Sequence, residues 1–167
     1  MTDSLLDVNV LLALAWPNHQ FHRPARRWLA GHEGAWCTCA LTQLGFVRLS
    51  SNPAFTDQAK LPAEATRLLI GMTRHGGHRF VGELPPLESP EFVEAVERML
   101  GHQQVTDGYL VALAQHHDLQ LVTFARRIEA LPRDHRTVLR LTPVSYTHLT
   151  LPTNTNAGRC RGGAGDF

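Results

Sequence analysis

Short apolar runs alternate along the chain with longer segments of helical periodicity, and this alternation limits the possible folds most strongly. The apolar runs are a first one that ends at Asp7, then residues 35–40, 79–81, 119–124 and 137–141. The helical segments are residues 8–16, 24–30, 41–49, 62–74, 90–100 and a sixth that begins at Thr106. Strands that alternate with helices of this length predict a parallel sheet covered on both faces. We therefore expect an α/β protein, a three-layer α/β/α sandwich with a mostly parallel central sheet.

Cap and breaker residues predict where the helices begin and end. Pro24 suits the first turn of the second helix, and Gly31 suits the position just past its end. Ser89 is the predicted N-cap of the fifth helix, and Thr106 is the predicted N-cap of the sixth. Helical spacing predicts a buried stripe on the fifth helix made of Phe92, Val93, Val96, Met99 and Leu100.

The last part of the chain differs in character from the rest. Residues 144–167 have no periodicity and resemble translated sequencing-adapter read-through, so we predict a disordered or non-native tail. Residues 1–143 are then enough for one domain with a single hydrophobic core. The fold prediction rests on that domain alone.

Composition excludes several classes of protein. The net charge of +1 provides no general basic field, so any contact with nucleic acid needs a local cluster of arginines. No apolar run approaches the roughly 20 residues that cross a bilayer, and the first residues lack a signal-peptide pattern. The spacing of Cys37, Cys39 and Cys160 suits neither zinc nor a disulfide framework. We expect a soluble cytoplasmic protein with free thiols.

Asp7 is an acidic residue at the end of the first apolar run, where a strand passes into a helix. Two interpretations are open for it. A carboxylate at the end of a buried strand is costly to desolvate unless it is paired, hydrogen-bonded or holding a cation. An aspartate in this position also commonly serves as the N-cap of the following helix.

A second acid, Asp107, is expected at the same edge of the sheet. A helix that crosses between parallel strands begins at their carboxyl ends, so Asp107 in its first turn lies on the side where Asp7 ends a strand. Favourable interaction with the helix dipole is the alternative explanation for Asp107. Asn9, Thr123 and the pair Arg126 and Arg127 are expected nearby. Such a cleft suits a hard cation together with a phosphate ligand.

Three segments of the chain resemble the PIN-domain ribonucleases, specifically VapC-type toxins. They are Leu-Leu-Asp-Val-Asn-Val-Leu-Leu at 5–12, Leu-Thr-Gln-Leu-Gly-Phe-Val-Arg-Leu at 41–49 with Ser-Asn-Pro at 51–53, and Val-Thr-Asp-Gly-Tyr-Leu at 105–110 leading to Leu-Val-Thr-Phe at 121–124. The resemblance extends over about residues 3–143. It implies a PIN-like fold and an endoribonuclease dependent on Mg²⁺ or Mn²⁺. It also implies a VapB-type antitoxin partner, a homodimer and no membrane association.

The same resemblance assigns roles to particular residues. Asp7 and Asp107 match two acids of the family site and are the predicted catalytic and metal-binding residues, with Asn9 and Thr123 matching its amide and hydroxyl positions. Family members commonly have further acids where this chain has Gln43 and Ala125. Fewer charges weaken the binding of a second cation, which argues against a two-metal mechanism.

Other residues extend the predicted mechanism toward substrate. Asp7 and Asp107 would hold one Mg²⁺ for in-line attack on an RNA phosphodiester. Arg126 or Arg127 would meet the developing charge. Arg48 is either a contact to the RNA backbone or a solvated residue of its helix.

Two rival hypotheses remain open at this point. In the first, a catalytically weakened PIN domain binds RNA or an antitoxin without efficient cleavage, and Ala125 is its best argument. In the second, a phosphatase-like enzyme uses Asp7 as a nucleophile. The familiar aspartyl-phosphate motif has a second aspartate where this chain has Asn9, which argues against that hypothesis.

Overall fold

The centre of the protein is a sheet whose strands all run in the same direction. The computed structural model describes residues 2–142. Within them the strands are β1 (Ser4–Leu6), β2 (Trp36–Cys39), β3 (His78–Val81), β4 (Gln120–Thr123) and β5 (Val138–Arg140). Their order across the sheet is β3-β2-β1-β4-β5, and each neighbouring pair is parallel. The predicted parallel α/β architecture is confirmed, with no antiparallel pairing in the described part.

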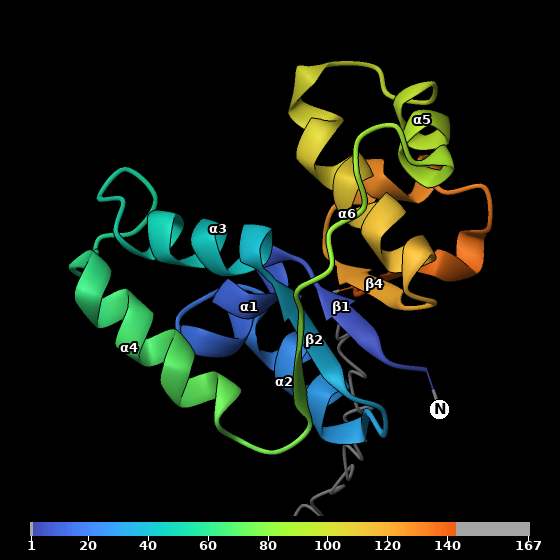
Figure 1. The fold of residues 1–167 in the computed structure, drawn as a ribbon. Helices are drawn as coiled ribbons and strands as arrows, with labels where there is room; N and C mark the ends of the chain where they lie inside the picture. Colours follow the sequence, from blue (N-terminus) through green and yellow to red (C-terminus); the bar gives the residue numbers. More distant parts are fainter. Residues whose placement is uncertain (1, 143–167) are drawn as a thin grey trace, which may run out of the picture.

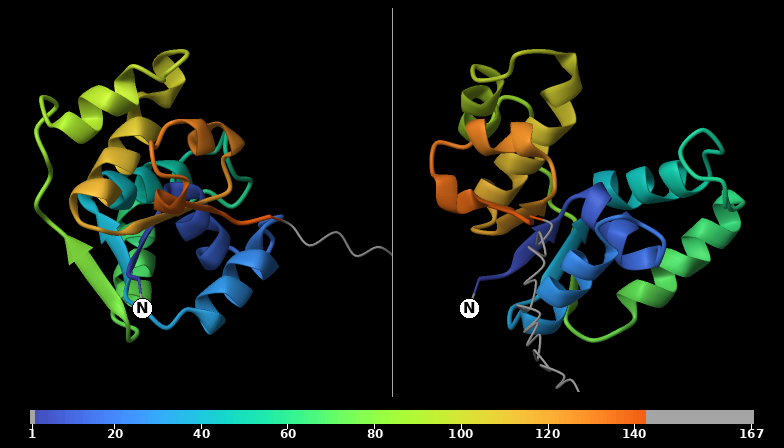
Figure 2. Two further views of the ribbon diagram at one scale, coloured as in Figure 1. Left: turned by 90° about the vertical axis from the view of Figure 1, so that its right-hand side faces the viewer. Right: turned by 180° about the vertical axis from the view of Figure 1, so that it is seen from behind.

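Helices cover both faces of this sheet (Figures 1 and 2). The helices α1 (Val8–Ala15), α2 (His22–Gly31), α3 (Ala40–Ser50) and α4 (Pro62–Thr73) pack on one face. Helix α6 (Val105–His116) packs on the other, and α5 (Pro90–Val96) packs against α6. Successive side chains of a strand point to opposite faces. Leu5 accordingly joins the core beneath α6, and Leu6 joins the core beneath α1 and α3.

The buried stripe predicted for the fifth helix is largely wrong. Helix α5 has only seven residues and packs through Phe92 and Ala95. Val93, Val96 and Leu100 are 47%, 44% and 96% exposed, respectively. Because the helix ends at Val96, the helical spacing of Met99 and Leu100 no longer corresponds to one face. Met99 is partly buried against the core under α6, and Leu100 points to solvent.

Three predicted helix ends also differ from the structure. Helix α2 begins at His22, so Pro24 is its third residue. The N–H groups of the first helical turn have no acceptor within the helix, so the N–H that proline lacks costs no hydrogen bond there. Gly31 is the last residue of α2 and does not follow its end. Thr106 does not cap α6. A short 3₁₀ helix, η1 (His102–Gln104), precedes α6 and makes Gln104 its N-cap. Ser89 does cap α5, because its hydroxyl accepts a hydrogen bond from the Phe92 amide.

The carboxyl ends of the strands form the edge where acidic side chains gather. Strand β1 ends one residue before Asp7, and β4 ends at Thr123. Helix α6 leads into β4, so its first turn lies at this same edge. In the described residues no helix is long and apolar enough to span a membrane. The predicted tail at 144–167 lies outside the described residues.

Candidate active site

Asp7 is a buried carboxylate tied to the next strand of the sheet. Its side chain is 5% exposed, and it accepts a 2.7 Å hydrogen bond at Oδ2 from the Thr123 hydroxyl on β4. Asn9 Nδ2 lies 3.5 Å from the same oxygen, a weak contact. Asp7 occupies the N-cap position of α1, but its side chain makes no capping hydrogen bond. Asp7 thus stands at the N-cap position without a side-chain capping bond, and its carboxylate bonds to β4 across the sheet edge.

The Thr123 hydroxyl is held in one orientation by a second hydrogen bond. The backbone N–H of Ala125 donates to Thr123 Oγ1 at 3.0 Å. A hydroxyl has one proton to donate. With a donor already directed at its oxygen, the Thr123 proton is committed to Asp7.

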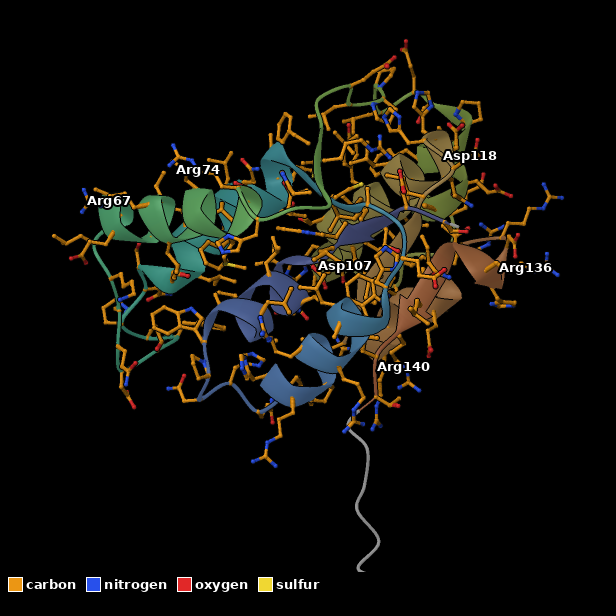
Figure 3. The ribbon with its side chains drawn as sticks, turned by 90° about the horizontal axis from the view of Figure 1, so that it is seen from below. Arg67, Arg74, Asp107, Asp118, Arg136 and Arg140 are labelled. Carbon is orange, nitrogen blue, oxygen red and sulfur yellow. The ribbon has the colours of Figure 1, made fainter. Side chains whose placement is uncertain are left out.

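Asp107 converges on Asp7 from the other side of the sheet. It lies in the first turn of α6 and is half-buried. Burial raises its pKa to about 6, and repulsion from the Asp7 charge adds to that shift. Figure 3 shows Asp107 near the middle of the molecule, whereas Arg67, Asp118 and Arg136 lie toward its periphery. The predicted convergence of the two acids is supported by this electrostatic coupling.

The pKa of Asp7 is also raised, and burial is the main cause. Hydrogen bonds from Thr123 and Asn9 and the nearby amides of Val8 and Asn9 oppose the shift without cancelling it. Within residues 2–142, neither Asp7 nor Asp107 forms an ion pair with a basic side chain. Two neighbouring carboxylates thus share a half-buried edge with no cationic partner.

This arrangement fits a divalent cation with hard oxygen ligands. Mg²⁺ commonly binds proteins through one or two carboxylates and completes its shell with water and phosphate oxygens. A bound cation would also offset the burial and repulsion that raise both pKa values. The described residues contain no group of three or more histidine, cysteine or acidic side chains arranged for a metal. The two aspartates are thus the available anchor.

Gln43 and Ala125 occupy the two positions where family members commonly have acids. Gln43 Nε2 donates a 2.9 Å hydrogen bond to Thr38 Oγ1 on β2, and that hydroxyl lies 2.9 Å from His78 Nε2. The Gln43 amide is thus engaged with the sheet and not with either aspartate. Ala125 lies two residues past the end of β4 and is half-buried against the core. Its contribution at the site is the backbone N–H that orients Thr123.

The three candidate arginines differ in their surroundings. Arg126 and Arg127 begin the short helix η2 (Arg126–Ala130) just after β4, and both are exposed. Arg127 donates a 3.4 Å hydrogen bond to Gln103 Oε1. Arg126 makes no hydrogen bond or ion pair inside the described range. Arg48 is exposed in the last turn of α3.

Tyr109 shapes the rim of the site, although the sequence pattern did not point to it. Its hydroxyl donates a 2.6 Å hydrogen bond to the carbonyl oxygen of Pro85 and so holds the connection between β3 and α5 against α6. A signal was available, because Tyr109 follows Asp107 by two residues and the pair Pro85-Pro86 predicts an extended segment whose carbonyl oxygens need hydrogen-bond donors from elsewhere.

Comparison with known proteins agrees with the fold. Residues 4–134 match the PIN domain. The chain is 41% identical to ribonuclease VapC38 of Mycobacterium tuberculosis over 122 residues, which cover 72% of this chain and 84% of that protein. Ribonuclease VapC39 of the same organism is 40% identical over 122 residues, 72% of this chain and 87% of its own length. Ribonuclease VapC44 is 40% identical over 126 residues, 75% of this chain and 87% of its own length.

Proposed function

This chain belongs to the PIN-domain family, and from that premise we propose that it is a VapC-type endoribonuclease, the toxin of a toxin–antitoxin pair. We further propose that its activity depends on a divalent cation held by Asp7 and Asp107. The observation that carries this part of the proposal is the coupled pair of carboxylates, Asp7 buried and Asp107 half-buried, without a basic partner in the described residues. A structural acid pair would normally be neutralised by arginine or lysine.

In the proposed site some residues bind the cation and others orient the groups that bind it. Asp7 and Asp107 bind Mg²⁺ or Mn²⁺, and Thr123 keeps the Asp7 carboxylate in one position. When bound, the cation supplies a Lewis acid that polarises a phosphate oxygen and lowers the pKa of a water molecule. Asn9, exposed beside Asp7, orients that carboxylate or a water molecule. Exposed Arg126 and Arg127 are placed to receive phosphate oxygens of the substrate.

The proposed partners follow from the family. The substrate is RNA, and a VapB-type antitoxin holds the protein inactive. We also propose a cytoplasmic homodimer. Exposed apolar side chains on α3 and α4, Leu44 at 68% and Ile70 at 43%, support a role for these helices in protein contacts.

A second candidate function is favoured by two specific observations. Ala125 supplies no carboxylate, and the Gln43 amide is already engaged with Thr38. A site with only two acids is consistent with a domain that binds RNA or an antitoxin with little cleavage. This candidate predicts RNA binding without turnover.

The experiment that tests the proposal compares RNA cleavage by the full chain and by three aspartate variants. The wild type is expected to cut a mixed RNA pool with Mg²⁺ or Mn²⁺ and to stop on addition of EDTA. Asp7→Asn and Asp107→Asn should lose cleavage. The matched control is Asp118→Asn, an exposed aspartate at φ 52° whose conformation asparagine also accepts.

The possible results separate the candidates. Full activity in Asp7→Asn would overturn the metal-site proposal. Absence of cleavage by the wild type, together with retained RNA binding, would favour the second candidate function.

A further inference from the structure

An apolar groove of about 390 Å³ lies on the rim of the proposed site. Four segments form it: the start of α3, the connection between β3 and α5, Phe92 of α5, and the start of α6. Its walls include Leu41, Leu84, Pro86, Leu87, Val105 and Tyr109, and no charged side chain lines it. Leu87 and Val105 are 65% and 49% exposed. The groove is therefore an open, uncharged surface and not a part of the core.

The groove adjoins the first turn of α6, the turn that also carries Asp107. Thr106 and Tyr109, which line it, are on the same turn of α6 as Asp107. Residues 106 to 109 of an α-helix rise by only about 4.5 Å along its axis. An RNA strand that contacts Asp107 through a phosphate and a cation would pass around this turn of α6, by way of Thr106, to place a base in the groove.

The connection between β3 and α5, which forms one wall of the groove, is held in place by hydrogen bonds from α6 and its C-cap residue. Tyr109 donates to the Pro85 carbonyl oxygen at 2.6 Å, and His117 Nε2 lies 2.7 Å from the Glu83 carbonyl oxygen. The Tyr109 ring also packs edge-on against Phe92, with 5.5 Å between the ring centroids. Two carbonyls of the 82–88 segment are thus held by one helix, so the groove exists before any ligand binds.

We propose that this groove is a nucleobase subsite, which receives an unstacked base of the RNA strand whose phosphate lies at Asp7 and Asp107. The inference rests on the proposed function. Flat bases pack on aromatic and apolar side chains, and single-stranded RNA is commonly recognised in this way. The absence of a charged lining side chain disfavours a phosphate there and suits an uncharged base. In this proposal the groove binds a base of the RNA, and Asp7 and Asp107 bind the phosphate of its backbone through the cation.

Thr106 provides the means to distinguish one base from another. Its side chain is exposed at the groove and has no hydrogen-bond partner in the described residues. The Tyr109 hydroxyl, in contrast, is engaged with Pro85. The Thr106 hydroxyl both donates and accepts, so it can bind a polar edge of a base. We expect cleavage to depend on the identity of one base next to the scissile phosphate.

The test locates the base by photocrosslinking. Single-stranded RNA oligonucleotides with one 5-iodouridine, moved along the strand from one oligonucleotide to the next, are irradiated with the full-length Asp7→Asn variant, which keeps the RNA uncut. Peptide mapping is expected to place the strongest crosslink at Tyr109 for one position of the label. Crosslinks that map only outside the groove would overturn the inference.

A matched pair of variants provides the second measurement. Leu87→Ser removes an exposed wall of the groove, and Val93→Ser removes a similarly exposed apolar side chain of α5 outside it. Leu87→Ser should reduce the Tyr109 crosslink at least about fivefold and flatten the base preference of cleavage in the wild-type background. Val93→Ser should leave both unchanged, and equal effects of the two variants would contradict the proposal.

The outcomes separate this inference from the function on which it rests. Metal-dependent cleavage without a groove crosslink overturns the subsite and leaves the nuclease proposal standing. A groove crosslink without cleavage by the wild type supports the subsite and overturns the nuclease proposal. If Leu87→Ser converts a dimer to a monomer in sedimentation and no crosslink maps to the groove, the groove is an interface between copies, and the subsite is overturned.

Discussion

The Thr123 hydroxyl donates a 2.7 Å hydrogen bond to Asp7 across 116 residues of sequence. This bond joins the carboxyl ends of two neighbouring strands, β1 and β4. It also determines what Asp7 does, because the carboxylate is held at the sheet edge and makes no capping bond to α1. The Ala125 N–H donates to the Thr123 oxygen, so the Thr123 hydroxyl acts as acceptor toward Ala125 and as donor toward Asp7.

Replacing Thr123 by valine should weaken cation binding at the site while leaving the packing around residue 123 unchanged. The substitution keeps the volume but removes the hydrogen bond to a buried carboxylate, which contributes about 2 kcal/mol when the acceptor is charged. We expect Mn²⁺ affinity to fall roughly 10- to 100-fold, as for other groups that orient metal ligands. Titration of the protein with Mn²⁺ measures this change directly.

Thr123→Ser is the control for that experiment, since serine keeps the hydroxyl. It should retain most of the wild-type Mn²⁺ affinity. Equal affinities for the valine variant and the wild type would show that Thr123 does not orient Asp7 for metal binding.

The stability of the metal-free protein should depend on the ionisation of Asp107. Its pKa rises from 3.8 to about 6 in the folded state, so the folded form binds a proton more tightly than the unfolded form does. The resulting stabilisation is complete below pH 3.8 and is lost as the pH rises through about 6. Asp107→Asn avoids that loss.

The variant should therefore be more stable than the wild type at pH 8 by about 1 kcal/mol, a value reduced for partial exposure of the group. The difference should disappear near pH 4. Urea unfolding in EDTA across this range measures it. A variant that is less stable at pH 8 and equally so at pH 4 would contradict the assignment of the shift to Asp107.

Ala125→Asp should strengthen the binding of a divalent cation. The new carboxylate would lie two residues past β4, at the position whose backbone N–H bonds to Thr123. We expect roughly tenfold tighter binding of Mn²⁺, because affinity rises with the number of charged ligands. Without metal, added repulsion should lower the free energy of unfolding by about 1 kcal/mol.

Ala125→Asn separates charge from size in this experiment. It should not strengthen Mn²⁺ binding. If the aspartate and asparagine variants bind Mn²⁺ equally, the position does not face the cation.

Arg126→Ala should weaken the binding of RNA and reduce its salt dependence. Arg126 is exposed just after β4 and has no partner within the described residues. Loss of one phosphate contact to a single strand lowers the slope of log K against log salt by about 0.7. The measurement uses uncut RNA bound to Asp7→Asn protein at several salt concentrations.

Arg67→Ala serves as the comparison for this prediction. Arg67 is an exposed arginine of α4 at the periphery of the molecule (Figure 3). The salt slope should not change in this variant. Identical slopes for both variants would exclude a specific phosphate contact at Arg126.

Much of the architecture could be predicted because its signals are local. The alternation of Leu5 and Leu6 between the two cores follows from the pleat of a strand, and Ser89 acts as the cap that its position predicts. The convergence of Asp7 and Asp107 followed from the direction of a crossover helix between parallel strands.

The failures have a common physical cause. Val93, Val96 and Leu100 are apolar at helical spacing, but α5 is short and only Phe92 and Ala95 reach the core. Spacing indicates which residues share a face, and it does not show how far the helix continues or what covers that face. Thr106 resembled a cap, but the 3₁₀ helix η1 already leads the chain into α6.

The amino-acid sequence was thus enough to predict the parallel α/β order and to place Asp7 and Asp107 at the same edge of the sheet. Local sterics and periodicity carry that information along the chain. The partners of individual polar groups required the three-dimensional arrangement: Thr123 for Asp7, Thr38 for Gln43 and Pro85 for Tyr109. A polar side chain binds whichever complementary group the packed fold brings within reach, and that group is set by the packing of the whole chain and not by local sequence.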